Sequence, residues 1–217
     1  EYIKERCDVS LKRLGVDTID LYLVHMWDPL TPLADIAETL IGLREQGKVR
    51  AIGVSNHSVE QCRAQRKFGP YAVVQPPYSF VDPAGETDLL PYCQSENIGV
   101  MIYSPMHKGL LTGKYAGDET FSDFRSNHPD FQGDRFKELC DKVRSLKPVA
   151  ERNGLTLYQL VLAATLMHPA IHVAICGIKT PAQIEEAVGA MGKTLSREDH
   201  FAVRNAVGPG SPKVADA

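Results

Sequence analysis

Residues 52–56, Ile-Gly-Val-Ser-Asn, decide the fold of this chain. A run of small and β-branched residues, 51–54, stops abruptly at Ser55 and Asn56. The Ser-Val-Glu-Gln stretch at 58–61 then has the spacing of a capping box that opens a helix. A buried strand that ends in polar side chains just before a helix is typical of α/β barrels and doubly wound sheets, which place their chemistry at that point.

The same pattern of apolar run, polar residue and helix recurs along the chain. Strands are predicted at 19–25, 49–54, 71–74, 99–103 and 172–176. Helices are predicted up to Leu14, at 33–45, 59–67, 88–96, 136–152 and 157–167, and from the capping residues Thr180 and Ser196 onward. Strands that alternate with helices predict a parallel sheet covered by helices.

Polar side chains stand at the carboxyl end of each predicted strand. They are His25, Ser55 with Asn56, Gln75, Tyr103 with Ser104, and Lys179. Because the carboxyl ends of parallel strands lie on one face of the sheet, these residues are expected to line one pocket although they are far apart in sequence.

Five strands do not close a barrel, because a (β/α)₈ barrel needs eight strands and about 250 residues. No capping residue precedes the first helix, so the chain opens as if cut. We therefore expect an incomplete (β/α)₈ barrel, five strands of eight, that forms a single domain over residues 1–217. Periodicity disappears after Tyr115, which predicts a lid-like loop over 115–135, and residues 209–217 form a polar tail.

Composition bounds the class of protein. The 217 residues are 43% hydrophobic and 24% charged with a net charge of -3, which suits one sizeable core and argues against a nucleic-acid partner. No apolar run approaches the about 20 residues that cross a bilayer, so no membrane association is expected. The five cysteines lack C-x-x-C spacing and are interpreted as reduced core thiols of a cytoplasmic protein. The histidines other than His25 lack ligand spacing, so we expect them at the surface or in turns and expect no metal site.

Five motifs follow one another in an order that resembles the aldo-keto reductase family. They are 11–25 (Leu-Lys-Arg-Leu-Gly-Val-Asp-Thr-Ile-Asp-Leu-Tyr-Leu-Val-His), 47–56 (Gly-Lys-Val-Arg-Ala-Ile-Gly-Val-Ser-Asn), 74–78 (Val-Gln-Pro-Pro-Tyr), 103–106 (Tyr-Ser-Pro-Met) with 109–115 (Gly-Leu-Leu-Thr-Gly-Lys-Tyr), and 177–186 (Gly-Ile-Lys-Thr-Pro-Ala-Gln-Ile-Glu-Glu). The 74–78 and 109–115 variants resemble the bacterial and potassium-channel β-subunit branch.

The resemblance implies a (β/α)₈ barrel that binds NADP(H) and reduces a small aldehyde or ketone to an alcohol. In the family, hydride passes from the nicotinamide to the carbonyl while a tyrosine, acting with a lysine, an aspartate and a histidine, supplies the proton. The resemblance matches only the histidine, His25, within this chain and places the other three before residue 1. We therefore expect the chain on its own to be inactive. The alternative is a non-catalytic NADPH-binding regulatory or interaction protein of the same fold.

The resemblance also assigns cofactor contacts residue by residue. Ser55, Asn56 and Gln75 are expected at the nicotinamide carboxamide, and the ring of Tyr103 is expected to stack on the nicotinamide. Ser104, Leu110, Gly113 and Lys114 are expected along the pyrophosphate, Lys179 at the 2′-phosphate, and Gln183 and Glu186 at the adenosine. The family commonly has Asn after that glutamate, whereas this chain has Ala187, which predicts a lost adenine contact.

Without the resemblance, several of these residues have plainer interpretations. A lone histidine at a strand end is more often structural, Ser55 and Asn56 equally suit a cap or turn, and Tyr103 suits a core. The resemblance gives His25 the role of orienting the substrate carbonyl, as a neutral imidazole donor can. Trp27 beside it suits an apolar substrate wall or plain packing. Exposed sheet edges favour pairing, so a homo-oligomer is possible.

Overall fold

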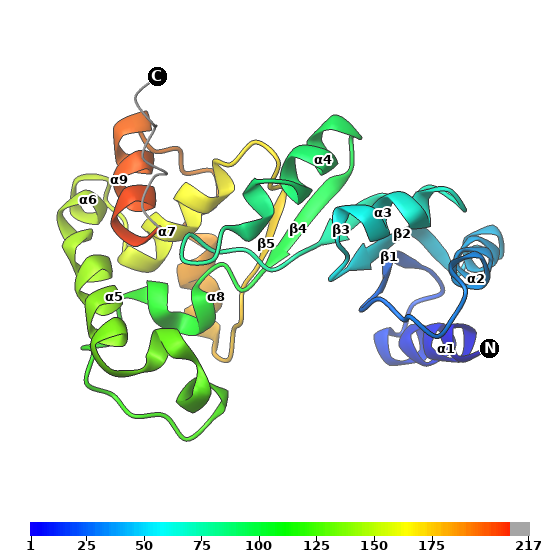
Figure 1. Cartoon of the computed structure of the whole chain (residues 1–217), viewed down its shortest axis with the longest axis horizontal. Helices are drawn as coiled ribbons and strands as arrows, with labels where there is room; N and C mark the ends of the chain where they lie inside the picture. Colours follow the sequence, from blue (N-terminus) through cyan, green and yellow to red (C-terminus); the bar gives the residue numbers. More distant parts are fainter. Residues whose placement is uncertain (209–217) are drawn as a thin grey trace. The chain divides into compact units, whose positions relative to one another are not determined.

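The computed structural model describes residues 1–208, in which the chain forms two compact units (Figure 1). The first unit consists of residues 1–76 and 85–101, and the second of 77–84 and the described residues from 102 onward. The sequence predicts one domain, and each unit is described here by itself. The predicted polar tail, 209–217, lies outside the described residues.

Five strands form a sheet whose order follows the chain. They are β1 (Ile19–Val24), β2 (Val49–Ser55), β3 (Val73–Gln75), β4 (Gly99–Tyr103) and β5 (Val173–Ile175), in the order β1-β2-β3-β4-β5. The pairs β1–β2, β2–β3 and β3–β4 are parallel. In their registers Val24 lies beside Val54 and Ser55 lies beside Gln75, so the first three strands end at neighbouring positions. The predicted parallel, helix-alternating sheet is confirmed, with β3 two residues later than expected.

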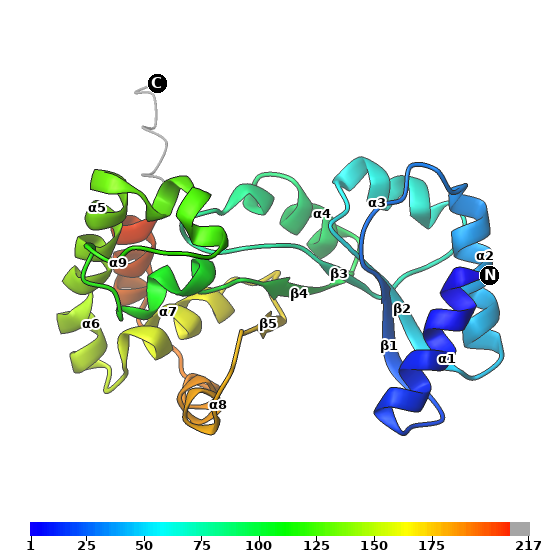
Figure 2. The ribbon, with the colours of Figure 1, turned by 90° about the horizontal axis from the view of Figure 1, so that it is seen from below.

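Helices cover the strands of the first unit. They are α1 (Tyr2–Leu14), α2 (Leu33–Glu45), α3 (Val59–Arg66) and α4 (Leu89–Ser95), and a short 3₁₀ turn, η1 (Ala84–Glu86), precedes α4. Figure 2 shows α1 and α2 lying against each other, and α2 also packs on β2. The helix α2 buries an apolar stripe at Ile36, Ala37, Leu40 and Leu43, whose spacing of three and four is that of one helical face.

The limits of these elements follow from local chemistry. Gly15 ends α1 in a left-handed conformation with φ 67°, and its N–H donates to the carbonyl of Leu11. Ser58 opens α3 with the predicted capping box, because its side chain accepts from the N–H of Gln61 and the Gln61 side chain accepts in return. Equivalent boxes open the helices that follow Thr156 and Thr180.

The second unit is mainly helical. It contains η2 (His107–Thr112), η3 (Phe124–Asn127), η4 (Pro129–Phe131), α5 (Gly133–Ser145), α6 (Lys147–Arg152), α7 (Leu157–Leu166), α8 (Pro181–Val188) and α9 (Arg197–Val207). The core of this unit forms where α7 packs against α6, α8 and α9 (Figure 1). Leu111, Val143, Leu160 and Val203 are fully buried within it.

The single helix predicted over 136–152 is wrong, since two helices occupy that range. α5 ends at Ser145 and α6 begins at Lys147, with Pro148 in the first turn of α6. Proline has no N–H to donate to the preceding turn and its ring crowds the carbonyl four residues back, so one continuous helix does not form through it.

The segment over 115–135 has a core face, contrary to the expectation from its missing periodicity. Tyr115 and Phe131 are buried and pack with Phe136, Leu139 and Leu110. The ring of Tyr115 meets that of Phe136 edge to face with the centroids at 5.7 Å, and the rings of Phe131 and Phe136 stack. Short 3₁₀ turns hold this cluster, which helical and strand periodicities do not reveal. The lid-like role of the segment stays a prediction.

The cysteines are unpaired, as expected. Cys7, Cys62, Cys93 and Cys140 are buried and Cys176 is half-buried. Burial raises the pKa of the Cys93 thiol to about 12 and that of Cys140 to about 11, so these thiols are protonated and unreactive at neutral pH. No helix between residues 1 and 208 has both the length and the apolar character needed to cross a membrane.

One buried carboxylate joins two helices of the second unit. Asp199 in α9 accepts from Nε of Arg152 at 2.9 Å and from Nδ2 of Asn153 at 2.8 Å, both at the end of α6. Its own N–H donates to the capping hydroxyl of Ser196 at 3.0 Å. The guanidinium of Arg152, followed by the amide of Asn153, holds the pKa of Asp199 below its usual range.

Replacing Asp199 by Asn is expected to lower the free energy of unfolding by about 1–3 kcal/mol at pH 7, because hydrogen bonds to a charged acceptor are lost. Because the pKa of Asp199 is lower in the folded state, the carboxylate stabilises the fold at pH values above its unfolded-state pKa of about 4. This stabilisation is lost as the pH falls through the folded-state pKa. The difference between the two proteins in urea unfolding should therefore shrink below pH 4. If the two proteins differed as much in free energy of unfolding below pH 4 as at pH 7, the proposed role of the Asp199 carboxylate would be contradicted. Asp141→Asn, in an exposed pair with Arg144, should cost under about 1 kcal/mol.

Candidate functional site

Three predicted site residues of the first unit lie together at the ends of β1, β2 and β3. The N–H of Asn56 donates to the carbonyl of Gln75 at 3.3 Å, and Nδ2 of Asn56 donates to the carbonyl of His25 at 2.9 Å. Asn56 adopts a left-handed backbone with φ 57°, which Asn tolerates better than most side chains. The strand ends thus hold His25, Asn56 and Gln75 in one hydrogen-bonded group, with the side chain of His25 exposed.

Ser55 lies behind this group rather than on its surface. It is 1% exposed, and its hydroxyl donates to the carbonyl of Gln75 at 2.9 Å. The amide nitrogen of Gln75 donates to the sulfur of Met101 at 3.5 Å, on the neighbouring strand β4. Ser55 and Met101 therefore position the side chains of Asn56 and Gln75.

His57 is buried in the turn between β2 and α3, so a surface position is excluded for it while a turn position is confirmed. It is 5% exposed, with Nδ1 2.8 Å from the carbonyl of Ser55 and with the ring of Trp27 packed edge to face at 5.4 Å. Burial lowers the pKa of His57 and keeps the imidazole neutral at pH 7. Trp27 thus packs against the turn that carries Asn56, while its predicted contact with substrate stays a prediction.

A pocket of about 540 Å³ runs along β1 between α1 and α2 in the first unit. The residues at the end of β1, His25 and Met26, line one part of it, and Asp28, Thr31 and Asp35 line another. Of the predicted site residues, His25 is the one that borders this pocket.

In the second unit, β4 leads into a loop with an unusual backbone. Ser104, His107 and Lys108 have φ values of 60°, 43° and 57°, in the left-handed region that favours glycine. Such conformations cost of order 1 kcal/mol each and gather at sites where the surroundings enforce them. Tyr103 precedes this loop, half-buried, with its carbonyl accepting from the N–H of Tyr78 at 3.1 Å.

The predicted pyrophosphate residues follow in η2 and the turn after it. Leu110 is 1% exposed and belongs to the aromatic cluster with Tyr115, so only its backbone is available to a ligand. Gly113 has φ 78°, and a Cβ there would meet Cδ1 of Leu157 at 2.5 Å, so the position requires glycine. Lys114 is exposed, with Nζ 4.8 Å above the ring of Tyr115.

Lys179 stands at the start of α8. Its N–H donates to Oε1 of Gln183 at 2.6 Å, within the predicted capping box of Thr180. Glu186, one turn further along, accepts from the hydroxyl of Thr156 at 2.8 Å. The side chains of Gln183 and Glu186 thus have structural partners, and their predicted contacts with adenosine stay predictions. The Lys179 side chain is exposed at a helix N-terminus, where an anion is favoured.

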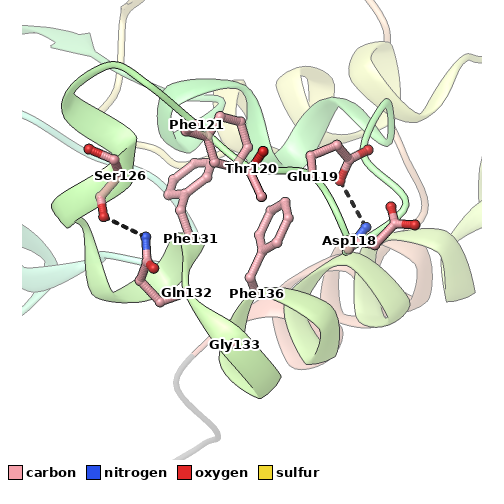
Figure 3. Close-up of a pocket in the computed structure, with 10 residues that line it drawn as sticks. Asp118, Glu119, Thr120, Phe121, Ser126, Phe131, Gln132, Gly133 and Phe136 are labelled. Atoms are coloured by element: carbon pink, nitrogen blue, oxygen red, sulfur yellow. Dashed lines mark hydrogen bonds between the residues drawn. The ribbon is translucent and has the colours of Figure 1, made fainter.

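A pocket of about 320 Å³ lies in the predicted lid-like segment, and Figure 3 shows Phe121, Phe131 and Phe136 in its wall. The side-chain amide of Gln132 closes one end by donating to the carbonyl of Ser126 at 2.7 Å. None of the predicted cofactor residues lines this pocket.

The structure also brings together a group that sequence spacing missed. His107, His128 and Asp130 each offer one ligand atom, and these atoms lie within 4.8 Å of one another. Nε2 of His107 is 2.9 Å from a carboxylate oxygen of Asp130. His107 is 5% exposed and lies in the 3₁₀ turn η2, so a surface position is excluded for it while a turn position is not. Two loops supply this group, which is why no H-x-x-x-H pattern pointed to it.

Known proteins similar to this chain are reductases and a channel subunit. Aldo-keto reductase YhdN of Bacillus subtilis (strain 168) is 40% identical over 200 residues, covering 91% of this chain and 60% of the relative. The NADH-specific methylglyoxal reductase of Escherichia coli (strain K12) is 34% identical over 208 residues, covering 94% of this chain and 64% of the relative. A putative voltage-gated potassium channel subunit beta of Schizosaccharomyces pombe is 33% identical over 203 residues, covering 88% of this chain and 59% of the relative. The chain spans about three-fifths of the length of these relatives.

A solved structure gives the same result for the fold. The glycerol dehydrogenase AKR11B4 from Gluconobacter oxydans superimposes with a TM-score of 0.90 at 34% identity, covering 97% of this chain and 65% of that one. The expected incomplete (β/α)₈ barrel is therefore confirmed. The model of the aldo/keto reductase family matches residues 1–207. With motifs, fold and family model in agreement over the same residues, the chain belongs to the aldo-keto reductase family.

Proposed function

We propose that the protein reduces a small aldehyde or ketone to an alcohol with NADP(H). The observation that supports this most is the group at the ends of β1, β2 and β3, where Asn56 and Gln75 present primary amides beside His25. A nicotinamide carboxamide needs both donors and acceptors, and primary amides supply both. The cofactor, when bound, supplies a hydride to the carbonyl carbon.

The chain's own residues would bind and orient the reactants. Asn56 and Gln75 would hold the carboxamide, with Ser55 fixing them from behind, while Tyr103 would stack on the nicotinamide ring. The imidazole of His25 would donate a hydrogen bond to the substrate carbonyl and fix its direction. Trp27 would border the substrate.

The remaining contacts concern the far end of the cofactor. The loop with Ser104, Leu110, Gly113 and Lys114 would follow the pyrophosphate through its backbone N–H groups and the lysine charge, and Gln183 and Glu186 would contact the adenosine. Lys179 would pair with the 2′-phosphate, which distinguishes NADP from NAD. A relative is named as an NADH-specific reductase, so the preference for NADP is tested by comparing NADPH with NADH.

The second candidate is a non-catalytic NADPH-binding regulatory or interaction protein, which the similarity to a channel β subunit favours. Both candidates bind NADPH, but only the enzyme consumes it. Oxidation of NADPH by the intact gene product in the presence of a small aldehyde would support the enzyme, whereas binding without oxidation would support the second candidate. For these 217 residues, which match only His25 of the four catalytic positions, we propose binding without turnover. A cytoplasmic location and a homo-oligomer stay predictions.

Two substitutions at Asn56 test the proposed carboxamide contact. Asn56→Gly keeps the left-handed backbone and removes the amide, so NADPH affinity should fall about tenfold, since each lost hydrogen bond is worth about 0.5–1.5 kcal/mol. Both variants lose the hydrogen bond from Asn56 to the carbonyl of His25, so Asn56→Ala should weaken NADPH binding equally and be about 1 kcal/mol less stable than Asn56→Gly, because alanine is strained at φ 57°. Calorimetric titration and thermal unfolding measure the two effects. Loss of affinity in the alanine variant alone would mean that strain, and not the amide, is responsible.

A further inference from the structure

We infer that His107, His128 and Asp130 form a binding site for a divalent transition metal ion of the zinc type, built from the loops η2 and η4 of the second unit. His107 shares η2 with Leu110 of the proposed pyrophosphate loop, but none of the three ligand residues is a proposed cofactor contact, and the inference does not depend on those contacts. Two imidazoles and one carboxylate are the donor set that zinc and its neighbours prefer, whereas calcium and magnesium take oxygen ligands.

The distances between the ligand atoms suit one ion. Nε2 of His107 lies 2.9 Å from Oδ2 of Asp130, and Nδ1 of His128 lies 4.0 Å from the same oxygen. Zinc holds nitrogen and oxygen ligands at about 2.0–2.2 Å in a tetrahedron, which places ligand atoms roughly 3.3–3.6 Å apart. The two separations from Asp130 lie on either side of that value, and all the ligand atoms lie within 4.8 Å of one another, so the side chains must rotate to receive the ion.

The surroundings orient His107 as they do in metal sites. Nδ1 of His107 lies 3.1 Å from the hydroxyl of Ser79, which also accepts from the N–H of Asp82 at 3.1 Å. When Nδ1–H donates to this hydroxyl, the lone pair of Nε2 points toward Asp130. A second hydrogen bond that fixes the tautomer of a ligating histidine is a regular feature of zinc sites.

The second imidazole also presents a lone pair. Nδ1 of His128 accepts from the N–H of Asp130 at 3.3 Å, so the neutral ring carries its proton on Nε2. This hydrogen bond is long, and an ion that takes the lone pair of Nδ1 must replace it. His128 and Asp130 are half-buried, so an ion and a water ligand can reach the group from solvent. The left-handed backbone at His107 and Lys108 turns the buried imidazole toward η4, at a cost in strain that binding would offset.

Two cations also border the group. Nε of Arg135 donates to the other carboxylate oxygen of Asp130 at 3.2 Å, and Lys108 is adjacent to His107 in the chain. Both repel a metal ion, and Arg135 is half-exposed and bonded to the oxygen that the ion does not need. Removing the charge of Arg135 should therefore tighten metal binding, whereas the same change would only weaken a purely structural ion pair.

The test is Zn²⁺ binding by chelator-treated protein, measured by calorimetry and by metal content after dialysis. We expect one Zn²⁺ per chain, at least about tenfold weaker binding in His128→Gln and in Asp130→Asn, about tenfold weaker binding in Ser79→Ala, and tighter binding in Arg135→Gln. His172→Gln and Cys176→Ser, which remove an exposed histidine and the half-buried thiol outside the group, should bind as the unaltered protein does.

A measurement on the unaltered protein keeps the test valid if the variants do not fold. Co²⁺ bound to the unaltered protein should give visible absorption that Zn²⁺ abolishes, without the near-ultraviolet band of a metal thiolate. The inference is overturned if no Zn²⁺ is retained, if His128→Gln and Asp130→Asn fold and bind as tightly as the unaltered protein, or if a thiolate band shows that a cysteine holds the ion.

Discussion

Replacing Lys179 by Gln is expected to weaken NADPH binding about 10- to 100-fold, because a hydrogen bond between charged groups contributes about 1.5–3 kcal/mol. NADH binding should not change, since NADH lacks the 2′-phosphate. Lys179 is exposed at the start of α8, where the helix dipole adds to its charge. Glutamine removes the charge and keeps a polar end, on a side chain that is one bond shorter.

The neighbouring carboxylate of Asp123 shows that the charge of Lys179 acts on an anion close to it. Lys179 lies close enough to Asp123 for its charge to help lower the pKa of that carboxyl to about 2, after the larger effect of hydrogen bonds from Arg125. Lys179 thus already attracts the carboxylate of Asp123, and a phosphate would compete with that carboxylate for the lysine. Titration calorimetry with both cofactors measures the effect. Equal losses for NADPH and NADH would show that Lys179 contacts a part common to both and would remove the basis for NADP preference.

The matched control is Lys147→Gln, which neutralises an exposed lysine at the start of α6. It should change neither affinity. An equal loss in this variant would attribute the result to the net charge of the protein and not to a phosphate contact.

Replacing Gly53 by Ala is expected to destabilise the protein by about 2–3 kcal/mol, as overpacking in a close-packed core does. Gly53 is in the middle of β2, paired with Leu23 on one side and Val73 on the other. A Cβ at this position would lie 2.7 Å from the carbonyl oxygen of Val73 and 3.2 Å from Cδ2 of Leu23. The obstacle is backbone, so the strands β2 and β3 must separate to admit the methyl group.

The same separation should reach the site. Ser55 pairs with Gln75 two residues beyond Gly53, and its hydroxyl holds the carbonyl of Gln75. The Gly53→Ala variant should therefore also bind NADPH more weakly, although residue 53 has no proposed contact with it. Urea unfolding and cofactor titration on the same sample measure both effects.

Gly42→Ala, in the same unit, is a control that is expected to raise the stability of the protein instead of lowering it. Gly42 is inside α2, and no atom lies within 4 Å of a Cβ built there. Alanine should stabilise the helix by about 0.4–1 kcal/mol, because it restricts the unfolded chain without a clash. If Gly53→Ala were tolerated as well as Gly42→Ala, the close approach of β2 and β3 would not be a constraint on this fold.

Much of the fold is predictable from local sequence because local chemistry sets it. Capping residues such as Ser58, Thr156 and Thr180 and the stop at Gly15 mark helix ends through hydrogen bonds that involve neighbours in sequence. Strand ends are predictable for the same reason, since Ser55 and Asn56 interrupt an apolar run. The parallel order then follows from the alternation of strands and helices.

Features that depend on distant parts of the chain were missed. The burial of His57 depends on Trp27, thirty residues earlier, and the burial of His107 on Ser79 and Asp130. The buried Phe131 belongs to 3₁₀ turns, which carry no helical or strand period. The break before α6 is a different kind of miss, because its signal, Pro148, is local and the prediction of one helix over 136–152 overlooks it.

The candidate site shows the same division. The hydrogen bonds among His25, Asn56 and Gln75 follow from the parallel register of adjacent strands, which sequence order predicts. The partners that occupy the side chains of Gln183 and Glu186, and the burial of Leu110, depend on packing between α7, α8 and the aromatic cluster. Residue types alone do not show which atoms remain available to a ligand.

The central claim is that the strand-end residues of this chain bind a nicotinamide cofactor, and titration of NADPH against the emission of Trp27 tests it most directly. Trp27 is the single tryptophan and packs beside the turn that carries Asn56, so its emission should respond to a cofactor bound at that group. We predict a saturable fall in its emission that Asn56→Gly shifts to higher NADPH concentration. An emission that shows no saturation up to about 1 mM NADPH, the upper end of usual substrate constants, would contradict the claim.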